Sequence, residues 1–290
     1  METAAPAVSV LVRSHNDIRF IRETLEILLA QDYSDFEIVS CDDASSDGTA
    51  ACIDEFDSIR KVPRPDGAYV PGRTLNSMVQ ASRGEIIVFN NADAVPCGKN
   101  YLRELLAPFS DTEVVAVYGN QLCHDDASAL VRKDHARAFG DGSLAANWGN
   151  FFSLASSAIR KDKLLQHPFS NELQYSEDID WAHRARTRGE KIAYAANAQV
   201  RHSHNYTLLQ LRKRFYNEGL ADAKIFAKRQ SLLQCLARVI METLRDFVWL
   251  AKHGAWREIP QAPLRRWTQK FYCYLGERDF FRGVKREIKT

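Results

Sequence analysis

The 290-residue sequence lacks the features that mark several large classes of protein. Its six cysteines include no CxxC pair and no Cys/His cluster, so we expect reduced thiols, no zinc site and a cytoplasmic protein. Residues 1–7 have no apolar core, which argues against a signal peptide. No apolar run approaches the ~20 residues that span a bilayer. We therefore expect a protein that is soluble or lies on a membrane surface.

Charge and glycine motifs argue against two further classes. The net charge of +2 is too small to indicate a nucleic-acid-binding protein. No GxGxxG motif follows the first predicted strand, which argues against dinucleotide binding of the usual kind. The 45% of hydrophobic residues is enough for a sizeable core, in one large domain or in one domain with an appendage.

The most informative stretch is a continuous apolar run over residues 86–89 that stops at polar side chains. Such a run is typical of a strand buried on both faces of a parallel sheet. Asn91 and Asp93 follow it, and Pro96 ends the strand pairing because it lacks a backbone donor. Open α/β sheets bind ligands at the carboxyl ends of their strands. Asp93 is therefore either a ligand for Mg²⁺ or Mn²⁺ or a turn carboxylate that caps the next helix.

Two strand–helix units precede this stretch and indicate a doubly wound sheet. The predicted strands are residues 8–12 and 36–41, and the predicted helices are about 17–31 and 47–56. Further helices are expected over 74–82, 98–109 and 127–139. Further extended segments are expected over 114–118, 151–159, 192–194 and 199–201.

Polar residues after these strands are candidates for nucleotide contacts. Asp43 is favoured as an acceptor for a nucleobase imide or a ribose hydroxyl, with helix capping as its alternative, whereas Asp47 is favoured as a cap. Arg73 follows a Pro/Gly-rich loop, where it meets a diphosphate or remains a solvated surface arginine. Residues 124–143 are polar and irregular, which is typical of a lid or an acceptor loop.

A cluster of acids begins another predicted helix. Ser176 is a suitable N-cap, and Glu177, Asp178 and Asp180 fall in the first turn, where the helix dipole favours them. Asp178 and Trp181 share one side of the helix, so not all three acids face one pocket. Asp178 is a candidate general base. Further on, His202 and His204 share a face if the backbone is extended and diverge if it turns.

These segments, taken in order, resemble family 2 glycosyltransferases of the GT-A fold. The resemblance covers roughly residues 8–215, and it is carried by the stretches VSVLVRSHN, DDASSDGT, LNSMVQASRGEIIVFNNADAVP, SEDIDW and VRHSH. The finer pattern is similar to a bacterial rhamnosyltransferase branch in YVPGRTLN, VVAVYGNQ, YSEDIDWAHRARTRG and HSHNYTLLQL.

The resemblance implies an architecture and two binding sites. It implies a doubly wound, mostly parallel α/β sheet in a catalytic domain over residues 1–205, with a helical region over 206–290. Nucleotide contacts fall on Arg13 and Asp43, and we also predict nucleotide contacts for Arg73 and Asn91. The metal motif falls on residues 91–93, where Asn91 replaces an acid and leaves Asp93 as the main acidic ligand of Mg²⁺ or Mn²⁺.

The resemblance also implies the reaction. Asp178 is the expected base, His202 a metal ligand, and Glu177, His204 and Trp181 supporting residues. We expect an inverting transfer of rhamnose from dTDP-rhamnose to a cell-surface glycan or lipid-linked acceptor. A UDP-hexose donor remains open, because uracil and thymine share the imide edge. A non-catalytic nucleotide- or glycan-binding module also remains open, favoured by Asn91 and opposed by Asp178 and His202.

The last part of the chain predicts long amphipathic helices. Residues 251–290 contain ten basic and four acidic side chains, a net charge of +6, interleaved with aromatic residues. That combination suits an anionic membrane surface, on the inner face of the cytoplasmic membrane. The alternative is that the aromatic residues pack on the catalytic domain while the charges are solvated.

Overall fold

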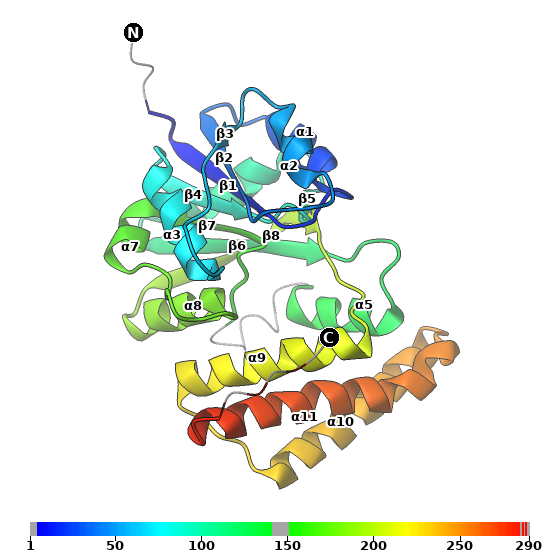
Figure 1. Cartoon of the computed structure of the whole chain (residues 1–290). Helices are drawn as coiled ribbons and strands as arrows, with labels where there is room; N and C mark the ends of the chain where they lie inside the picture. Colours follow the sequence, from blue (N-terminus) through cyan, green and yellow to red (C-terminus); the bar gives the residue numbers. More distant parts are fainter. Residues whose placement is uncertain (1–4, 141–150, 285, 287, 289–290) are drawn as a thin grey trace. The chain divides into compact units, whose positions relative to one another are not determined.

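The structure is a computed structural model that describes residues 5–140, 151–284, 286 and 288 (Figure 1). The chain divides into two compact units. The first comprises the described residues of 1–124, 137–172 and 177–203, and the second those of 125–136, 173–176 and 204–290. The prediction of domains over 1–205 and 206–290 stays a prediction, and two short segments from the first range group with the C-terminal helices.

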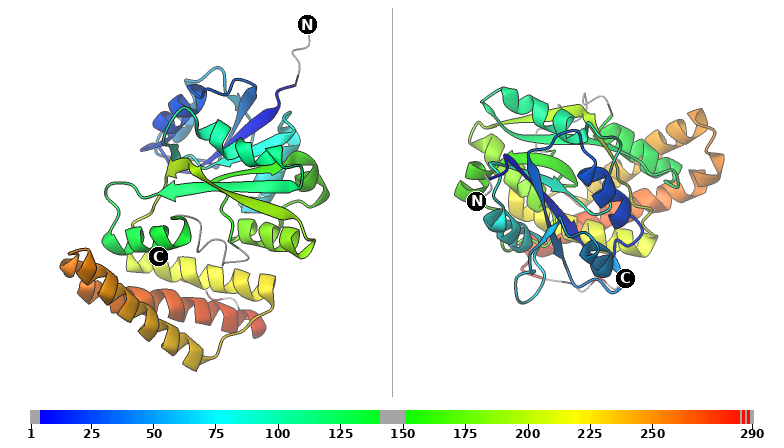
Figure 2. Two further views of the ribbon diagram at one scale, coloured as in Figure 1. Left: turned by 180° about the vertical axis from the view of Figure 1, so that it is seen from behind. Right: turned by 90° about the horizontal axis from the view of Figure 1, so that it is seen from above.

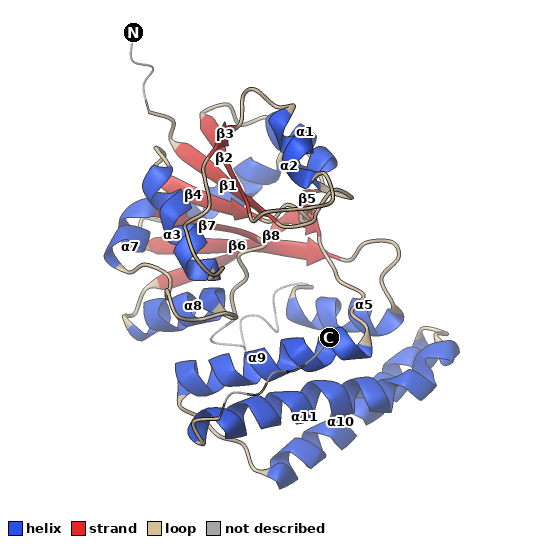
Figure 3. Ribbon diagram, viewed as in Figure 1, coloured by secondary structure: helices blue, strands red, loops and turns tan. Residues whose placement is uncertain are grey.

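A mixed sheet in the order β3-β2-β1-β4-β7-β6-β8-β5 forms the centre of the first unit (Figure 3). Strands β1, β2, β3 and β4 pair in parallel, as do β6 and β8, whereas β7 and β5 pair antiparallel with their neighbours. The strands are β1 Val8–Ser14, β2 Phe36–Asp42, β3 Arg60–Lys61, β4 Ile86–Asn90, β5 Val95–Pro96, β6 Val114–Leu122, β7 Ser156–Arg160 and β8 Lys191–Arg201.

Both faces of this sheet are covered, because alternate residues of its central strands enter different cores. Val10 of β1 and Val88 of β4 belong to one hydrophobic cluster, which also contains Leu25. Their neighbours Leu11 and Phe89 belong to a second cluster. The helices of this unit are α1 Ile21–Leu29, α2 Thr49–Asp54, α3 Pro71–Ala81, α4 Tyr101–Leu106, η1 Ala107–Ser110, α7 Lys161–Gln166 and α8 Glu177–Thr187. The predicted doubly wound α/β class is confirmed.

Several predicted elements differ from the observed ones. Pro96, expected to end strand pairing, belongs to β5 and pairs with Val200 of β8. The extended segment predicted over 151–159 is a strand only from Ser156. The segments 192–194 and 199–201 belong to a single strand, β8, whose pairing with β6 shifts register between Gly119 and Asn120. Gly119 is needed there, because a Cβ atom would lie 2.6 Å from the carbonyl oxygen of Ala198. Helix α1 begins at Ile21 and not at Asp17, because the carbonyl of Asp17 accepts the N–H groups of Phe20 and Ile21 in a preceding turn.

The second unit is helical. It contains most of α5 (Ala129–Ala138), together with α9 Leu208–Phe226, α10 Leu232–Lys252, η2 Trp256–Gln261 and α11 Ala262–Phe281. Helix α11 packs against both α9 and α10 (Figure 2). Capping boxes fix the starts of α9 and α10 through Thr207 with Gln210 and Ser231 with Gln234. No described helix is long and apolar enough to cross a bilayer.

Glycines bring two of these helices into backbone contact. A Cβ atom on Gly276 of α11 would lie 2.1 Å from the carbonyl oxygen of Tyr216 in α9. A Cβ atom on Gly219 of α9 would lie 2.1 Å from the carbonyl oxygen of Cys273 in α11. Neither position accepts a larger residue without separating the helices.

Candidate functional site

The loop after β4 is tied to the end of β1. The backbone N–H of Ala92 donates to the carbonyl of Arg13 at 3.2 Å, and Thr24 Oγ1 donates to the carbonyl of Ala92 at 2.8 Å. Because β1 and β4 are parallel neighbours, their carboxyl ends meet at one edge of the sheet. Asn91 and Asp93 therefore lie on a loop whose backbone is held on both sides.

Asp93 lies next to His202, the residue after β8. Their Oδ1 and Nε2 atoms are 3.5 Å apart, and the side chains are 15% and 13% exposed. A ligand atom of His204, two residues further along the chain, lies within 4.8 Å of those of Asp93 and His202. One carboxylate and two imidazoles at this separation are a donor set for a divalent transition-metal ion.

A hydrogen-bond chain orients the imidazole of His202. Gln121 Nε2 donates to Ser153 Oγ at 2.8 Å, which leaves Gln121 Oε1 to accept from His202 Nδ1 at 2.8 Å. In this arrangement His202 Nδ1 carries the proton, and its Nε2 lone pair is directed toward Asp93. Ligating histidines are commonly held in this way through the second ring nitrogen. The residues present therefore fit a metal ion.

Arg13, near the end of β1, forms an ion pair with Glu177 at the start of α8. Arg13 Nη1 lies 3.4 Å from Glu177 Oε1, with the side chains 19% and 11% exposed. Burial lowers the pKa of Arg13, but the nearby Glu177, Tyr69 and Asp178 outweigh it and raise that pKa overall. The guanidinium is therefore a permanent positive charge beside two carboxyl groups.

Asp178 is half-buried beside this pair. Burial, followed by the charge of Glu177, raises the pKa of Asp178 to about 7, although hydrogen bonding from the N–H of Ile179 works in the opposite direction. That N–H lies 2.8 Å from Asp178 Oδ1. A carboxyl group with a pKa near neutrality suits a general base, because it is both available and basic enough to accept a proton.

The two acids after β2 have different surroundings. Asp42 accepts from Ser14 Oγ at 2.9 Å and from the N–H of Ser45 at 2.9 Å, so it organises the loop. Asp43 forms a 2.7 Å ion pair with Arg64. Nearby, Asp47 accepts from the N–H and hydroxyl of Thr49. The N-cap position of α2 is Gly48, however, and not the predicted Asp47.

The sequence analysis did not predict three residues that act on the candidate site residues. Arg64 pairs with Asp43, Tyr69 acts on the charge of Arg13, and Gln121 holds His202. A signal existed for Arg64 and Tyr69, because both lie in the Pro/Gly-rich loop that follows β3 on the same sheet edge. Gln121 had none, because its role depends on the pairing of β6 with β8.

The two remaining predicted residues in the first unit are Arg73 and Trp181. Arg73 is exposed in the first turn of α3. Trp181 is completely buried, and its Nε1–H donates to the carbonyl of His167 at 2.9 Å. Trp181 packs with Phe152 and Phe169 in the second hydrophobic cluster, so it supports α8 from within the core.

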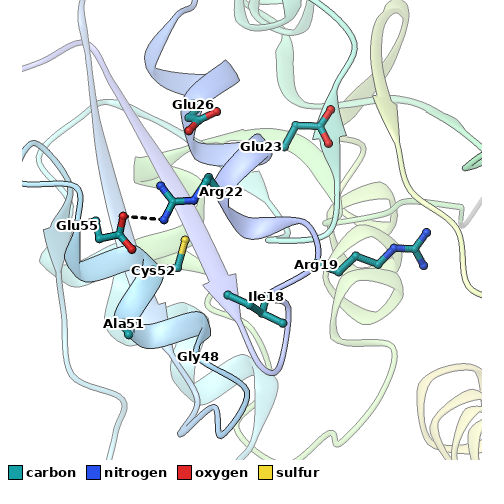
Figure 4. A pocket seen from close by; sticks show the side chains of 9 residues that line it. All are labelled: Ile18, Arg19, Arg22, Glu23, Glu26, Gly48, Ala51, Cys52 and Glu55. Carbon is teal, nitrogen blue, oxygen red and sulfur yellow. Dashed lines mark hydrogen bonds and ion pairs between the residues drawn. The ribbon is translucent and has the colours of Figure 1, made fainter.

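A surface pocket of about 450 Å³ lies between α1 and α2 (Figure 4). An ion pair of 2.6 Å between Arg22 and Glu55 crosses it. Its lining includes none of the predicted site residues, and consists of Ile18, Arg19, Arg22, Glu23, Glu26, Gly48, Ala51, Cys52 and Glu55. This pocket is therefore not the predicted site.

Comparison with solved structures defines the class of fold. A mannosyltransferase of Pyrobaculum calidifontis, solved with GDP-Man and Mn²⁺, is 17% identical with a TM-score of 0.69, over 98% of this chain and 89% of that chain. Glucosyl-3-phosphoglycerate synthase of Mycobacterium tuberculosis, solved with Mn²⁺, UDP-Glc and phosphoglyceric acid, is 18% identical with a TM-score of 0.59, over 77% and 80%. The first unit has the GT-A glycosyltransferase fold, as predicted.

Comparison of sequences defines the family. A profile described as "Glycosyltransferase like family 2" matches residues 5–216, and the chain belongs to this glycosyltransferase family. The O-antigen chain rhamnosyltransferase WbaN of Salmonella anatum is 32% identical over 64% of this chain and 62% of its own length. RfbN of Salmonella typhimurium, also an O-antigen chain rhamnosyltransferase, is 25% identical over 74% and 72%. The chain thus matches less than two thirds of the length of WbaN.

Proposed function

We propose that this chain is a metal-dependent, inverting glycosyltransferase that moves rhamnose from dTDP-rhamnose to a glycan or lipid-linked acceptor in cell-envelope polysaccharide synthesis. The geometry that carries the proposal is the position of Asp178 beside the Arg13–Glu177 ion pair, where burial and the charge of Glu177 raise the pKa of Asp178 to about 7. The similarity to WbaN and RfbN supports rhamnose as the sugar.

Asp178 is the base of the proposed reaction. Its carboxylate accepts the proton of the acceptor hydroxyl while the hydroxyl oxygen forms a bond to the anomeric carbon. The bond from that carbon to the donor phosphate breaks, and the nucleoside diphosphate leaves with the electron pair. A single displacement of this kind inverts the anomeric configuration. Arg13 supplies fixed positive charge near the developing negative charge.

Asp93, His202 and His204 would hold the divalent cation. When bound, such an ion neutralises charge on the leaving diphosphate. Two imidazoles and one carboxylate favour Mn²⁺ over Mg²⁺, because Mg²⁺ prefers an all-oxygen environment. Asn91 adds a neutral carbonyl oxygen to this loop in place of a second carboxylate, so the site carries one negative charge from residues 91–93.

The nucleotide is proposed to lie along the ends of β1 and β2. Asp43 accepts the imide N–H of thymine, and Arg64 holds that carboxylate in place through their 2.7 Å ion pair. Arg13, Arg73 and Asn91 complete the proposed donor contacts. Residues 1–205 form the proposed catalytic domain. The helical region 206–290 faces an anionic membrane surface on the cytoplasmic side.

The alternative donor is a UDP-hexose. Asp43 reads an edge that uracil and thymine share, so this contact does not discriminate between the two bases. A non-catalytic nucleotide-binding module is the alternative of a different class, and Asn91 is the feature that favours it.

A donor panel separates these proposals. We expect dTDP-rhamnose with Mn²⁺ to raise the melting temperature more than UDP-glucose or GDP-mannose does, and to support transfer to a rhamnose-accepting glycan. Asp178→Asn should keep the donor-induced stabilisation and lose transfer. Stabilisation by UDP-hexoses but not by dTDP-rhamnose would mean that the donor is a UDP-hexose. Binding without transfer by the wild-type chain would favour the non-catalytic module.

A further inference from the structure

Helix α10 has an exposed face with several large apolar side chains. Leu233, Ile240, Leu244 and Val248 are 78%, 61%, 57% and 56% exposed. Their spacing of seven, four and four residues places them along one face of the helix. Met241 extends this face and is 44% exposed. We call these five residues the α10 stripe.

The opposite side of α10 is buried and combines polar side chains with apolar ones, including Cys235 and Leu250. Asp246 is fully buried and accepts from Lys133 and from Arg266, whose Nε lies 2.6 Å away. Glu242 and Thr243 are also buried. Ionic contacts therefore share the inside of α10 with a few apolar residues, while the α10 stripe remains exposed.

The charges that flank the α10 stripe are all positive. Arg238, Arg245 and Lys252 are exposed and spaced seven residues apart, so they form a row beside the stripe. The two acids of the helix, Glu242 and Asp246, are both buried, and Glu242 lies 2.8 Å from Arg245. The exposed surface of α10 thus combines apolar and cationic side chains without an exposed acid.

Residues 251–290 contribute less charge to the surface than their composition predicts. Arg266 is buried between Asp134 and Asp246. Arg278 and Arg286 both pair with Asp279. Residues 285, 287, 289 and 290 of this segment lie outside the described residues. Arg257 and Arg282 remain exposed in this segment. We place the surface suited to an anionic partner on α10, because exposed apolar and cationic side chains lie next to each other along that one helix.

Charge complementarity selects the partner of this surface. In an antiparallel pair of α10 helices, Arg238 of one copy would approach Arg245 of the other, and a parallel pair would oppose identical cations. Such like-charge contacts disfavour self-association. An anionic bilayer accepts both features, because acyl chains cover the apolar residues while headgroups meet the cations.

We propose that the α10 stripe and its row of cations bind the surface of an anionic bilayer, with α10 lying in the plane of the interface. The proposal deepens the proposed function and rests on it for its biological role, since a lipid-linked acceptor is reached at a membrane surface. Binding itself needs neither donor nor acceptor and can be measured without sugar transfer.

The test is co-sedimentation of the full chain with vesicles of phosphatidylcholine alone or with about 30% phosphatidylglycerol. We expect binding to the anionic vesicles, weakened by salt. The double variant Ile240→Gln/Leu244→Gln should bind at least about tenfold more weakly. Leu165→Gln on α7, also at an exposed leucine (55%), is the matched control and should bind like the wild type. Melting temperatures and circular dichroism verify folding.

A second variant tests the charges. Arg238→Gln/Lys252→Gln should weaken binding about fivefold for each charge removed, and only on anionic vesicles. Unchanged binding of Ile240→Gln/Leu244→Gln, or absence of wild-type binding, overturns the proposal. So does a dimer, seen by sedimentation velocity, that the same apolar substitutions dissociate. The α10 variants should still transfer sugar to a short water-soluble acceptor. If the wild type does not transfer sugar to that acceptor, the result counts against the proposed function and not against membrane binding.

Discussion

Arg13 and Glu177 lie 164 residues apart in the sequence and form an ion pair of 3.4 Å between the end of β1 and the start of α8. This pair places a guanidinium and a carboxylate next to Asp178, the proposed base. The charge of Glu177 raises the pKa of Asp178. The ionisation of Asp178 therefore depends on a contact between distant parts of the chain.

The rate of transfer should rise with pH through a pKa of about 7. A general base acts in its ionised form, and the pKa of Asp178 is raised to about 7 by burial and by Glu177. Asp178→Asn should lower kcat by at least about 100-fold and remove this limb of the profile. The measurement is kcat/KM against pH with saturating metal. Such a base titrates within roughly pH 5 to 9. A wild-type kcat/KM that stays constant over that range would show that Asp178 is not the base.

Glu177→Gln should move the acidic limb of the profile to lower pH, by up to about one unit. The charge of Glu177 raises the pKa of Asp178, so its removal lowers that pKa. Asp180→Asn is the matched control on the same helix, where Asp180 pairs with Arg184 at 2.9 Å. An equal shift in both variants would point to a general change in α8.

Asp178→Asn should also stabilise the folded protein at neutral and alkaline pH. A carboxyl group whose pKa rises on folding does not change the free energy of unfolding below pH ~4. Between that pH and its folded pKa it lowers the free energy of unfolding progressively, and above the folded pKa it lowers it by a constant amount. The gain in melting temperature should therefore grow between pH about 4 and 7, by roughly 2–4 °C per kcal/mol relieved. Thermal unfolding at several pH values measures it, and a gain independent of pH would show that relief of the buried charge is not the cause.

Gln121→Leu should weaken Mn²⁺ binding by about 10–100-fold. The variant removes the acceptor that holds the Nδ1–H of His202 and directs its Nε2 toward Asp93. Ser153→Ala leaves this acceptor in place and should have a smaller effect, although it frees the amide of Gln121. Titration of Mn²⁺ by electron paramagnetic resonance measures both. Equal affinity in the wild type and Gln121→Leu would remove Gln121 from the metal site.

Gly276→Ala should destabilise the helical unit by about 1–3 kcal/mol. The added methyl group would lie 2.1 Å from the carbonyl of Tyr216, so α9 and α11 must move apart. Gly219→Ala should act similarly, through the carbonyl of Cys273. Urea denaturation followed by tryptophan fluorescence measures the loss. A midpoint unchanged in both variants would mean that the helices do not touch through their backbones.

Local patterns in the sequence were enough for the central strands and the family. The apolar runs at 8–12 and 86–89 predict strands buried on both faces, because no side of them tolerates water. The polar residues that end these runs, including Arg13 and Asp93, identify the edge of the sheet where we propose that a ligand binds. These inferences need only neighbouring residues and the known behaviour of parallel sheets.

Tertiary structure alone decided which distant side chains meet. The partners of Asp43, Glu177 and His202 are set by strand register and helix position, which no local pattern encodes. The same holds for α10, whose periodicity shows which residues share a face but not which face is buried. Asp246 lies on the buried face because Lys133 and Arg266 neutralise it there, and that contact joins three separate segments of the chain.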